Sequence, residues 1–123
     1  MRLIKVPDSS FESEEVIIAG TTYNLLFKYN TSDAAWYITI RDTEFTPLVS
    51  GIKVMPNQNL TKAFSYLNIF SDGDLWCRRA KATRYPIGRD NFGVGKSYEL
   101  VWLSDVEMIN VEIEDVTQLP PQI

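Results

Sequence analysis

Thr22-Tyr23-Asn24-Leu25-Leu26-Phe27-Lys28-Tyr29 is the most informative segment of the chain. Large apolar side chains recur in it at every second position, at Tyr23, Leu25, Phe27 and Tyr29. Because successive side chains of a strand point to opposite faces, this alternation predicts a β-strand with one buried face. We therefore expect a chain that is mainly β.

The segments on either side of this strand extend the same pattern. Residues 16–19 are apolar and are followed by Gly20-Thr21, so residues 11–29 are predicted to form a β-hairpin. After a polar turn, Trp36, Ile38 and Ile40 alternate with more polar residues and indicate a third strand. Consecutive strands joined by short turns predict a β-meander.

The rest of the chain predicts further strands and at most one short helix. Residues 48–54 indicate a fourth strand, in which Gly51 is a candidate bulge that would bend the sheet. Residues 60–70 fit both periods, and we expect a short helical turn that leads into a strand. An Asp-Gly-Asp turn at residues 72–74 precedes a strand at 75–77, residues 84–95 read as an ordered loop, and residues 98–103 form one more strand.

The predicted fold class is thus a single small β-barrel or a rolled antiparallel sheet, a meander and possibly OB-like. Residues 1–103 are predicted to form one β domain, and residues 104–123 an acidic C-terminal extension with a Pro-rich tail. The chain has 123 residues, which suits one domain. No apolar run is long enough for a membrane span or a signal peptide, so we expect synthesis in the cytoplasm and no membrane partner.

Composition argues against an enzyme. The chain contains no histidine and one cysteine, Cys77, so it lacks the usual general base and any set of Cys and His metal ligands. Gly93-Val94-Gly95-Lys96-Ser97 resembles the end of a phosphate-binding loop, but that pattern needs glycine at the position of Asp90. We predict a glycine-rich turn there, a buried structural thiol at Cys77, and no catalytic residue, cofactor or metal.

Charge is distributed unevenly along the chain. Residues 1–96 hold all 12 Lys and Arg, whereas residues 97–123 hold six acidic residues and no basic one. A basic stretch precedes the acidic segment and comprises Arg78, Arg79, Lys81, Arg84 and Arg89. The two could pair within one chain or between neighbouring chains.

The basic stretch also supports an alternative function. Arginines that follow phosphates and aromatic rings that stack on bases are typical of single-strand binders, and Trp76 and Tyr85 lie among these basic residues. An OB-like module would then bind single-stranded nucleic acid through Arg78–Arg89. The net negative charge of the chain argues against this alternative, because single-strand binders usually carry a net positive charge.

Several segments match one family when they are taken in order. They are Phe11, Gly20-x-x-Tyr23-x-Leu25, Phe27-x-Tyr29-Asn30, Trp36-Tyr37-Ile38, Asp42 with Pro47-Leu48-Val49-Ser50-Gly51-Ile52, Asn59-Leu60, Arg89-Asp90-Asn91-Phe92-Gly93 and Tyr98-x-Leu100-Val101-Trp102-Leu103. Together they resemble the small baseplate plug proteins of contractile-tailed bacteriophages. The resemblance covers roughly residues 11–103.

This resemblance implies a structural component of the virion tail baseplate, a plug where the tail tube meets the central hub and spike. It implies no enzymatic activity, contacts with tube, hub and spike proteins, and several copies around the tail axis. Trp36 and Tyr37 would then lie on opposite faces of their strand, and one of them would anchor an interface.

Other interface residues are predicted from the basic stretch and the acidic segment. Arg89 is expected to reach a neighbouring chain while Asp90 and Asn91 hold its turn. In the acidic segment, alternating Ile109, Val111 and Ile113 would either complete the chain's own sheet or add a strand to a neighbour. The full predicted set is Trp36, Tyr37, Arg78, Arg79, Arg84, Arg89, Ile109, Val111 and Ile113.

Overall fold

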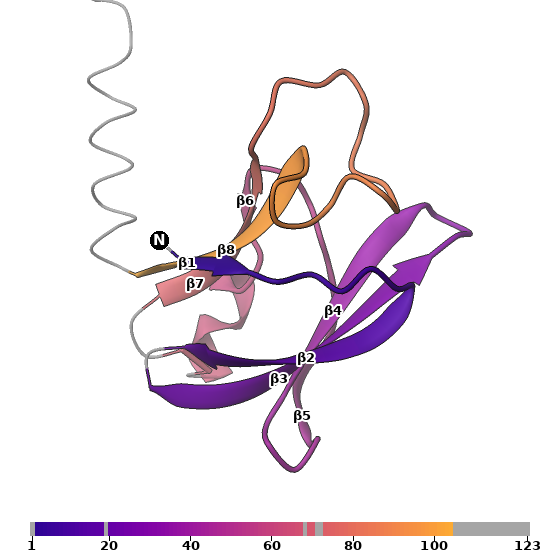
Figure 1. Ribbon diagram of the computed structural model, residues 1–123. Helices are drawn as coiled ribbons and strands as arrows, with labels where there is room; N and C mark the ends of the chain where they lie inside the picture. Colours follow the sequence, from indigo (N-terminus) through magenta and orange to yellow (C-terminus); the bar gives the residue numbers. More distant parts are fainter. Residues whose placement is uncertain (1, 19, 68, 71–72, 105–123) are drawn as a thin grey trace, which may run out of the picture.

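Two four-stranded antiparallel sheets make up the computed structural model, which describes residues 2–18, 20–67, 69–70 and 73–104. The first sheet has the order β2-β3-β4-β5 and the second the order β1-β8-β7-β6 (Figure 1). The elements are β1 (Arg2–Ile4), β2 (Phe11–Ile18), β3 (Thr21–Asn30), β4 (Ala35–Arg41), β5 (Pro47–Lys53), β6 (Gln58–Asn59), the 3₁₀ helix η1 (Lys62–Leu67), β7 (Gly73–Arg79) and β8 (Tyr98–Ser104).

The β2-β3-β4-β5 sheet is the predicted meander. Its hairpin pairs Phe11 with Lys28 at one end and Ile18 with Thr21 at the other. The alternation in β3 is confirmed, because Leu25 and Phe27 are fully buried, whereas Lys28 is exposed. The apolar period of the sequence therefore determined the register of this sheet.

Gly51 forms the predicted bulge in β5. Ile38 pairs with Ile52 and Ile40 with Val49, so β5 contains one residue more than β4 between these pairs. Gly51 adopts a φ of 68°, in the left-handed region that glycine tolerates best. Its N–H donates to the Thr39 hydroxyl at 3.1 Å, which fixes the bend.

The prediction of a turn at residues 72–74 is wrong at Gly73. Gly73 is already the first residue of β7 and pairs with Ser104 of β8. A Cβ at this position would lie 2.1 Å from the carbonyl oxygen of Leu103. The glycine is required here by a close approach of two backbones, which the sequence pattern does not distinguish from a turn.

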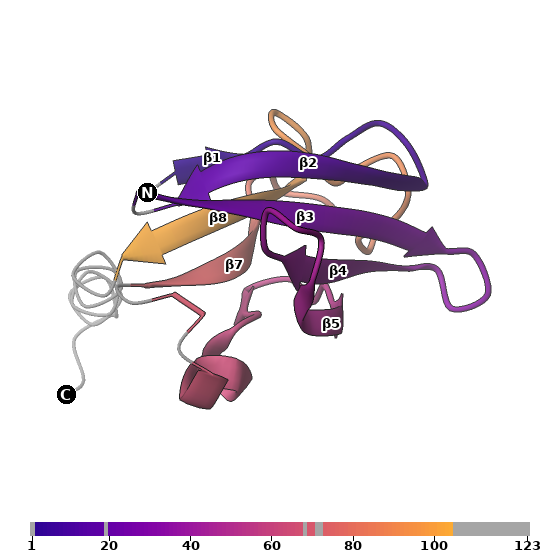
Figure 2. The same ribbon diagram turned by 90° about the horizontal axis from the view of Figure 1, so that it is seen from below.

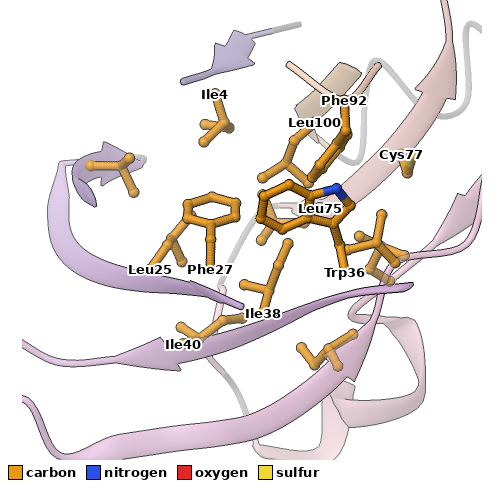
Figure 3. Packing of buried hydrophobic residues seen from close by; sticks show 14 of the residues in the cluster. Ile4, Leu25, Phe27, Trp36, Ile38, Ile40, Leu75, Cys77, Phe92 and Leu100 are labelled. Carbon is orange, nitrogen blue, oxygen red and sulfur yellow. The ribbon is translucent and has the colours of Figure 1, made fainter. Parts of the chain in front are cut away.

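The two sheets face one another around a single core, and in the described part of the chain no edge strand of one pairs with the other. The rolled-sheet alternative is therefore confirmed, and the sheets do not close into a barrel. The sheets lie as two layers in Figure 2. Core side chains come from both, among them Leu25, Phe27, Trp36, Leu75, Cys77 and Leu100 (Figure 3).

The ambiguous segment 60–70 contains the expected helical turn. Asn59 initiates it, because its side-chain oxygen accepts the N–H groups of Thr61 at 3.1 Å and Lys62 at 2.8 Å. The prediction of a strand directly after this turn is wrong at residues 69 and 70, which are described and lie in no strand. The alternation of aromatic residues there reflects packing of Phe64 and Phe70 on the core.

Candidate interface surfaces

Trp36 and Tyr37 lie on opposite faces of β4. Trp36 is 1% exposed and packs between Tyr29 and Phe92, with ring centres 5.3 and 5.7 Å away. Its indole N–H donates to the carbonyl of Gly88 at 2.9 Å. Trp36 is thus a core residue that holds the loop between β7 and β8 against the first sheet.

Tyr37 faces outward on the first sheet. It is half-buried and lines a shallow hollow of about 360 Å³, together with Leu26, Lys28, Asn30, Thr39 and Gly51. Its hydroxyl donates to Asp33, and this hydrogen bond raises the pKa of Tyr37. In the paired strands, Lys28 and Lys53 lie directly opposite Tyr37, one on each side. An aromatic ring between two lysines is a suitable contact surface for an acidic partner.

Arg78 is engaged within the chain. Its guanidinium donates to one carboxylate oxygen of Glu99, from Nε at 3.0 Å and from Nη2 at 2.7 Å. The other oxygen accepts the Gly95 N–H at 3.0 Å. Burial alone would raise the pKa of Glu99, but the Gly95 N–H, Arg78 and Lys81 together lower it below its usual value.

The Glu99 site predicts a specific pH dependence of stability. Because its pKa is lower in the folded than in the unfolded chain, its contribution is complete above about pH 4.5 and is lost as the pH falls through the folded value. We expect Glu99→Gln to lower the free energy of unfolding at pH 7 by about 1 to 3 kcal/mol and to flatten its pH dependence below pH 4.5.

Urea unfolding between pH 2.5 and 7 measures this effect. Glu12→Gln, which changes an exposed carboxylate of β2, serves as the control and should preserve the wild-type profile. A Glu99→Gln profile that runs parallel to wild type would contradict the assignment.

Arg89 connects the β7–β8 loop to the segment between β1 and β2. Its Nε donates to the Ser10 hydroxyl at 3.0 Å, and its Nη1 lies 3.2 Å from a carboxylate oxygen of Asp8. The guanidinium also lies over the Trp36 ring, 5.7 Å from its centre. Asn91 holds the turn as expected, since its side chain accepts the Gly88 N–H at 2.6 Å. Contact of Arg89 with a neighbouring chain stays a prediction.

Residues 79–85, here called the basic loop, expose three cations and a tyrosine. Arg79 donates to the carbonyl of Thr83, and Lys81 to that of Gly95 at 2.6 Å. The guanidinium of Arg84 lies 5.4 Å from the centre of the Tyr85 ring, which is 61% exposed. These hydrogen-bond and ring partners are uncharged, although Lys81 also contributes to the lowered pKa of Glu99.

The structure also describes the residues that sequence patterns associated with chemistry. Cys77 is fully buried, and burial raises its pKa to about 12, so it is the expected structural thiol. Residues 93–97 form a glycine-rich turn before a strand, as predicted. Within the described residues, no cluster of His, Cys, Asp or Glu is arranged to hold a metal, and no helix is long and apolar enough to cross a membrane.

Phe45 is an exposed aromatic residue that the sequence analysis did not identify as a surface feature. Phe45 is 59% exposed, with a φ of 64°, at the tip of the β4–β5 turn. Asp42 fixes this turn by accepting the N–H groups of Glu44 and Thr46, each at 2.9 Å. Asp42 was the residue from which this turn could have been predicted, because an aspartate that begins a turn often accepts hydrogen bonds from backbone N–H groups two or more residues later.

Ile109, Val111 and Ile113 lie outside the described residues, so their predicted contacts stay predictions. The boundary at residues 103 and 104 likewise stays a prediction, although β8 ends at Ser104. The interface roles of Arg79 and Arg84, and the nucleic-acid reading of the basic stretch, also stay predictions.

The described surfaces belong to a small all-β domain that presents aromatic and basic side chains from a rigid two-sheet frame. Surfaces of this kind are typical of proteins that act by binding other proteins. The family model of the cyanophage baseplate Pam3 plug gp18 matches residues 1–105, and the chain belongs to this family. No curated protein matches the chain.

The family confirms the resemblance read from the sequence. The protein is a viral structural protein of the bacteriophage tail baseplate and interacts with other baseplate proteins. The matched region ends two residues after the predicted boundary at residue 103.

Proposed function

We propose that the protein is a non-enzymatic plug at the junction of the tail tube with the central hub and spike. It is made in the cytoplasm of the host bacterium and is present in several copies around the tail axis. The family match carries this proposal, because it covers the whole described β domain. Tight internal packing around Trp36 suits a component that must hold its shape while its neighbours assemble on it.

The outer face of the first sheet is the proposed contact with those neighbours. Phe11, Lys28, Tyr37 and Lys53 lie in one row across its four strands. Phe11 is 64% exposed, so an apolar ring and a half-buried tyrosine alternate with two cations along this row. Trp36 supports the row from the core side, and Tyr37 is the residue that would touch the partner.

Cross-linking of isolated tails tests this proposal. Lys28 and Lys53 carry exposed amines in the proposed contact, and Lys62, in η1, is an exposed amine elsewhere. We expect amine-reactive cross-links from Lys28 and Lys53 to tube and hub proteins, identified by mass spectrometry. Cross-links from this chain to capsid proteins alone would contradict the proposal.

Replacement of Tyr37 should weaken incorporation into the baseplate without unfolding the protein. Central aromatic anchors contribute about 2 kcal/mol or more to an interface, so Tyr37→Ala should lower affinity for the partner by roughly 30-fold. Tyr37→Phe keeps the ring and should assemble nearly normally. Quantitative mass spectrometry of purified tails measures the occupancy, and equal occupancy for both variants would exclude Tyr37 as an anchor.

The acidic segment is proposed as a second assembly element. Ile109, Val111 and Ile113 alternate with polar residues and would add an apolar strand face to a neighbouring chain. This proposal rests on the sequence pattern of the segment.

A further inference from the structure

The backbone of the basic loop is fixed against the second sheet. The Ala80 N–H donates to the Ser97 carbonyl at 2.7 Å, directly after β7 ends. The Tyr98 hydroxyl donates to the Tyr85 carbonyl at 2.7 Å, and the Tyr85 N–H donates to the Thr83 hydroxyl at 3.2 Å. In Figure 1 the loop extends beyond the end of β7. Its side chains therefore leave an ordered frame, and a partner binds them at little cost in conformational entropy.

Positive charge gathers in this loop without a matching set of carboxylates. Residues 78–89 contain five Lys or Arg and no Asp or Glu. Lys81 helps to lower the pKa of Glu99, but that carboxylate is 5% exposed and binds Arg78. Three cations of the loop are exposed, and none of them forms an ion pair among the described residues, namely Arg79, Lys81 and Arg84. The loop thus carries an excess of positive charge that the carboxylates of a partner can neutralise.

The aromatic side chains of this region favour a protein partner over single-stranded nucleic acid. Tyr85 is 61% exposed, and the Arg84 guanidinium lies 5.4 Å from the centre of its ring. Trp76, the other ring of the basic stretch, is half-buried in β7. Single-strand binders stack successive bases on exposed rings, whereas a tyrosine beside arginines is typical of the residues that dominate protein interfaces. The protein also interacts with other baseplate proteins.

We propose that the basic loop binds an acidic patch on another baseplate protein. Arg79, Lys81 and Arg84 pair with carboxylates of the partner, and the Tyr85 ring packs against the residues beside them. The loop shares no residue with the row on the outer face of the first sheet. This inference rests on the proposed function and deepens it, because a plug with two separate contact surfaces joins two neighbours at once.

Carbodiimide cross-linking of isolated tails tests the proposal. The reagent activates a carboxylate, which the amine of Lys81 then attacks to form an amide, so a product forms only where the two groups meet. We expect Lys81 to be joined to an Asp or Glu of another baseplate protein, identified by mass spectrometry. Tails with Arg79→Gln and Arg84→Gln keep the reactive amine. Their yield of this product per incorporated chain should fall by about ten-fold, because two of the three charge pairs are lost.

Lys5→Gln combined with Lys62→Gln is the matched control. It removes the same charge from two other exposed residues and should leave the Lys81 product unchanged. Circular dichroism of each purified variant confirms that it is folded. Lys81 joined only to Glu99 of its own chain, or an unchanged yield in the Arg79→Gln, Arg84→Gln tails, would overturn the proposal.

Gel retardation of a single-stranded oligothymidine of about 20 nucleotides tests the nucleic-acid alternative. At about 0.01 M ionic strength, where electrostatic binding is strongest, we expect the isolated protein not to retard it. Retardation that Arg79→Gln and Arg84→Gln abolish would assign the loop to nucleic acid and overturn the proposal. Absence of the chain from tails would instead remove the plug function, whereas a chain that is present in tails without an intermolecular Lys81 product would remove only this contact.

Discussion

Gly73→Ala should be among the most destabilising single substitutions in this protein. The added Cβ would lie 2.1 Å from the Leu103 carbonyl oxygen and 2.8 Å from a carbon of the Trp102 ring. A backbone carbonyl inside a sheet does not move aside as a flexible side chain does, so β7 and β8 must separate. Overpacking of this kind costs about 3 kcal/mol or more in free energy of unfolding, which urea titration measures.

Gly88→Ala is the matched control for this prediction. A Cβ at Gly88 would meet only the Asn91 side-chain oxygen, at 3.8 Å, which is an ordinary contact. We therefore expect Gly88→Ala to change stability by less than about 1 kcal/mol. Equal stability of the two alanine variants would show that the close approach at Gly73 does not exist.

Trp36→Ala is expected to have a comparably large effect. It removes a side chain that is 1% exposed, two aromatic contacts, and the hydrogen bond to the Gly88 carbonyl. Removal of a buried tryptophan costs about 3 to 5 kcal/mol. The loop between β7 and β8 should also loosen, because Arg89 loses the ring on which it lies.

Urea unfolding and amide hydrogen exchange measure these two consequences. Phe11→Ala removes an aromatic ring that is 64% exposed and should cost less than about 1 kcal/mol. A Trp36→Ala protein as stable as the Phe11→Ala protein would contradict the assignment of Trp36 to the core. Faster exchange at Gly88 than in wild type would confirm that the indole holds the loop.

The meander was predictable from sequence because one physical signal dominates it. The strands β2, β3 and β4 bury mainly one face, so the period of two is visible at Leu25, Phe27, Ile38 and Ile40. The β8 strand shows less contrast, since Glu99 and Val101 are buried on the face opposite Leu100. At Gly73 the sequence predicted a turn, whereas the structure has a strand residue in close contact with a neighbouring backbone. A glycine between two aspartates is compatible with both, so the sequence pattern alone does not distinguish them.

The interface residues were only partly accessible to sequence reasoning. Opposite faces for Trp36 and Tyr37 follow from strand geometry. The sequence does not show which basic residues pair with a carboxylate. Arg78 binds Glu99, 21 positions away, only because the β7–β8 register places the two residues opposite each other. The same register places the basic loop and the end of β8 at opposite ends of the domain, which no local pattern encodes.

Cryo-electron microscopy of intact tails tests most directly whether this protein is a plug between tube and hub. We expect density for the two-sheet domain in several symmetry-related copies around the tail axis, in contact with both tube and hub proteins. Tails whose junction of tube and hub is complete without this chain, or density for it only in the capsid, would show that the protein is not a plug.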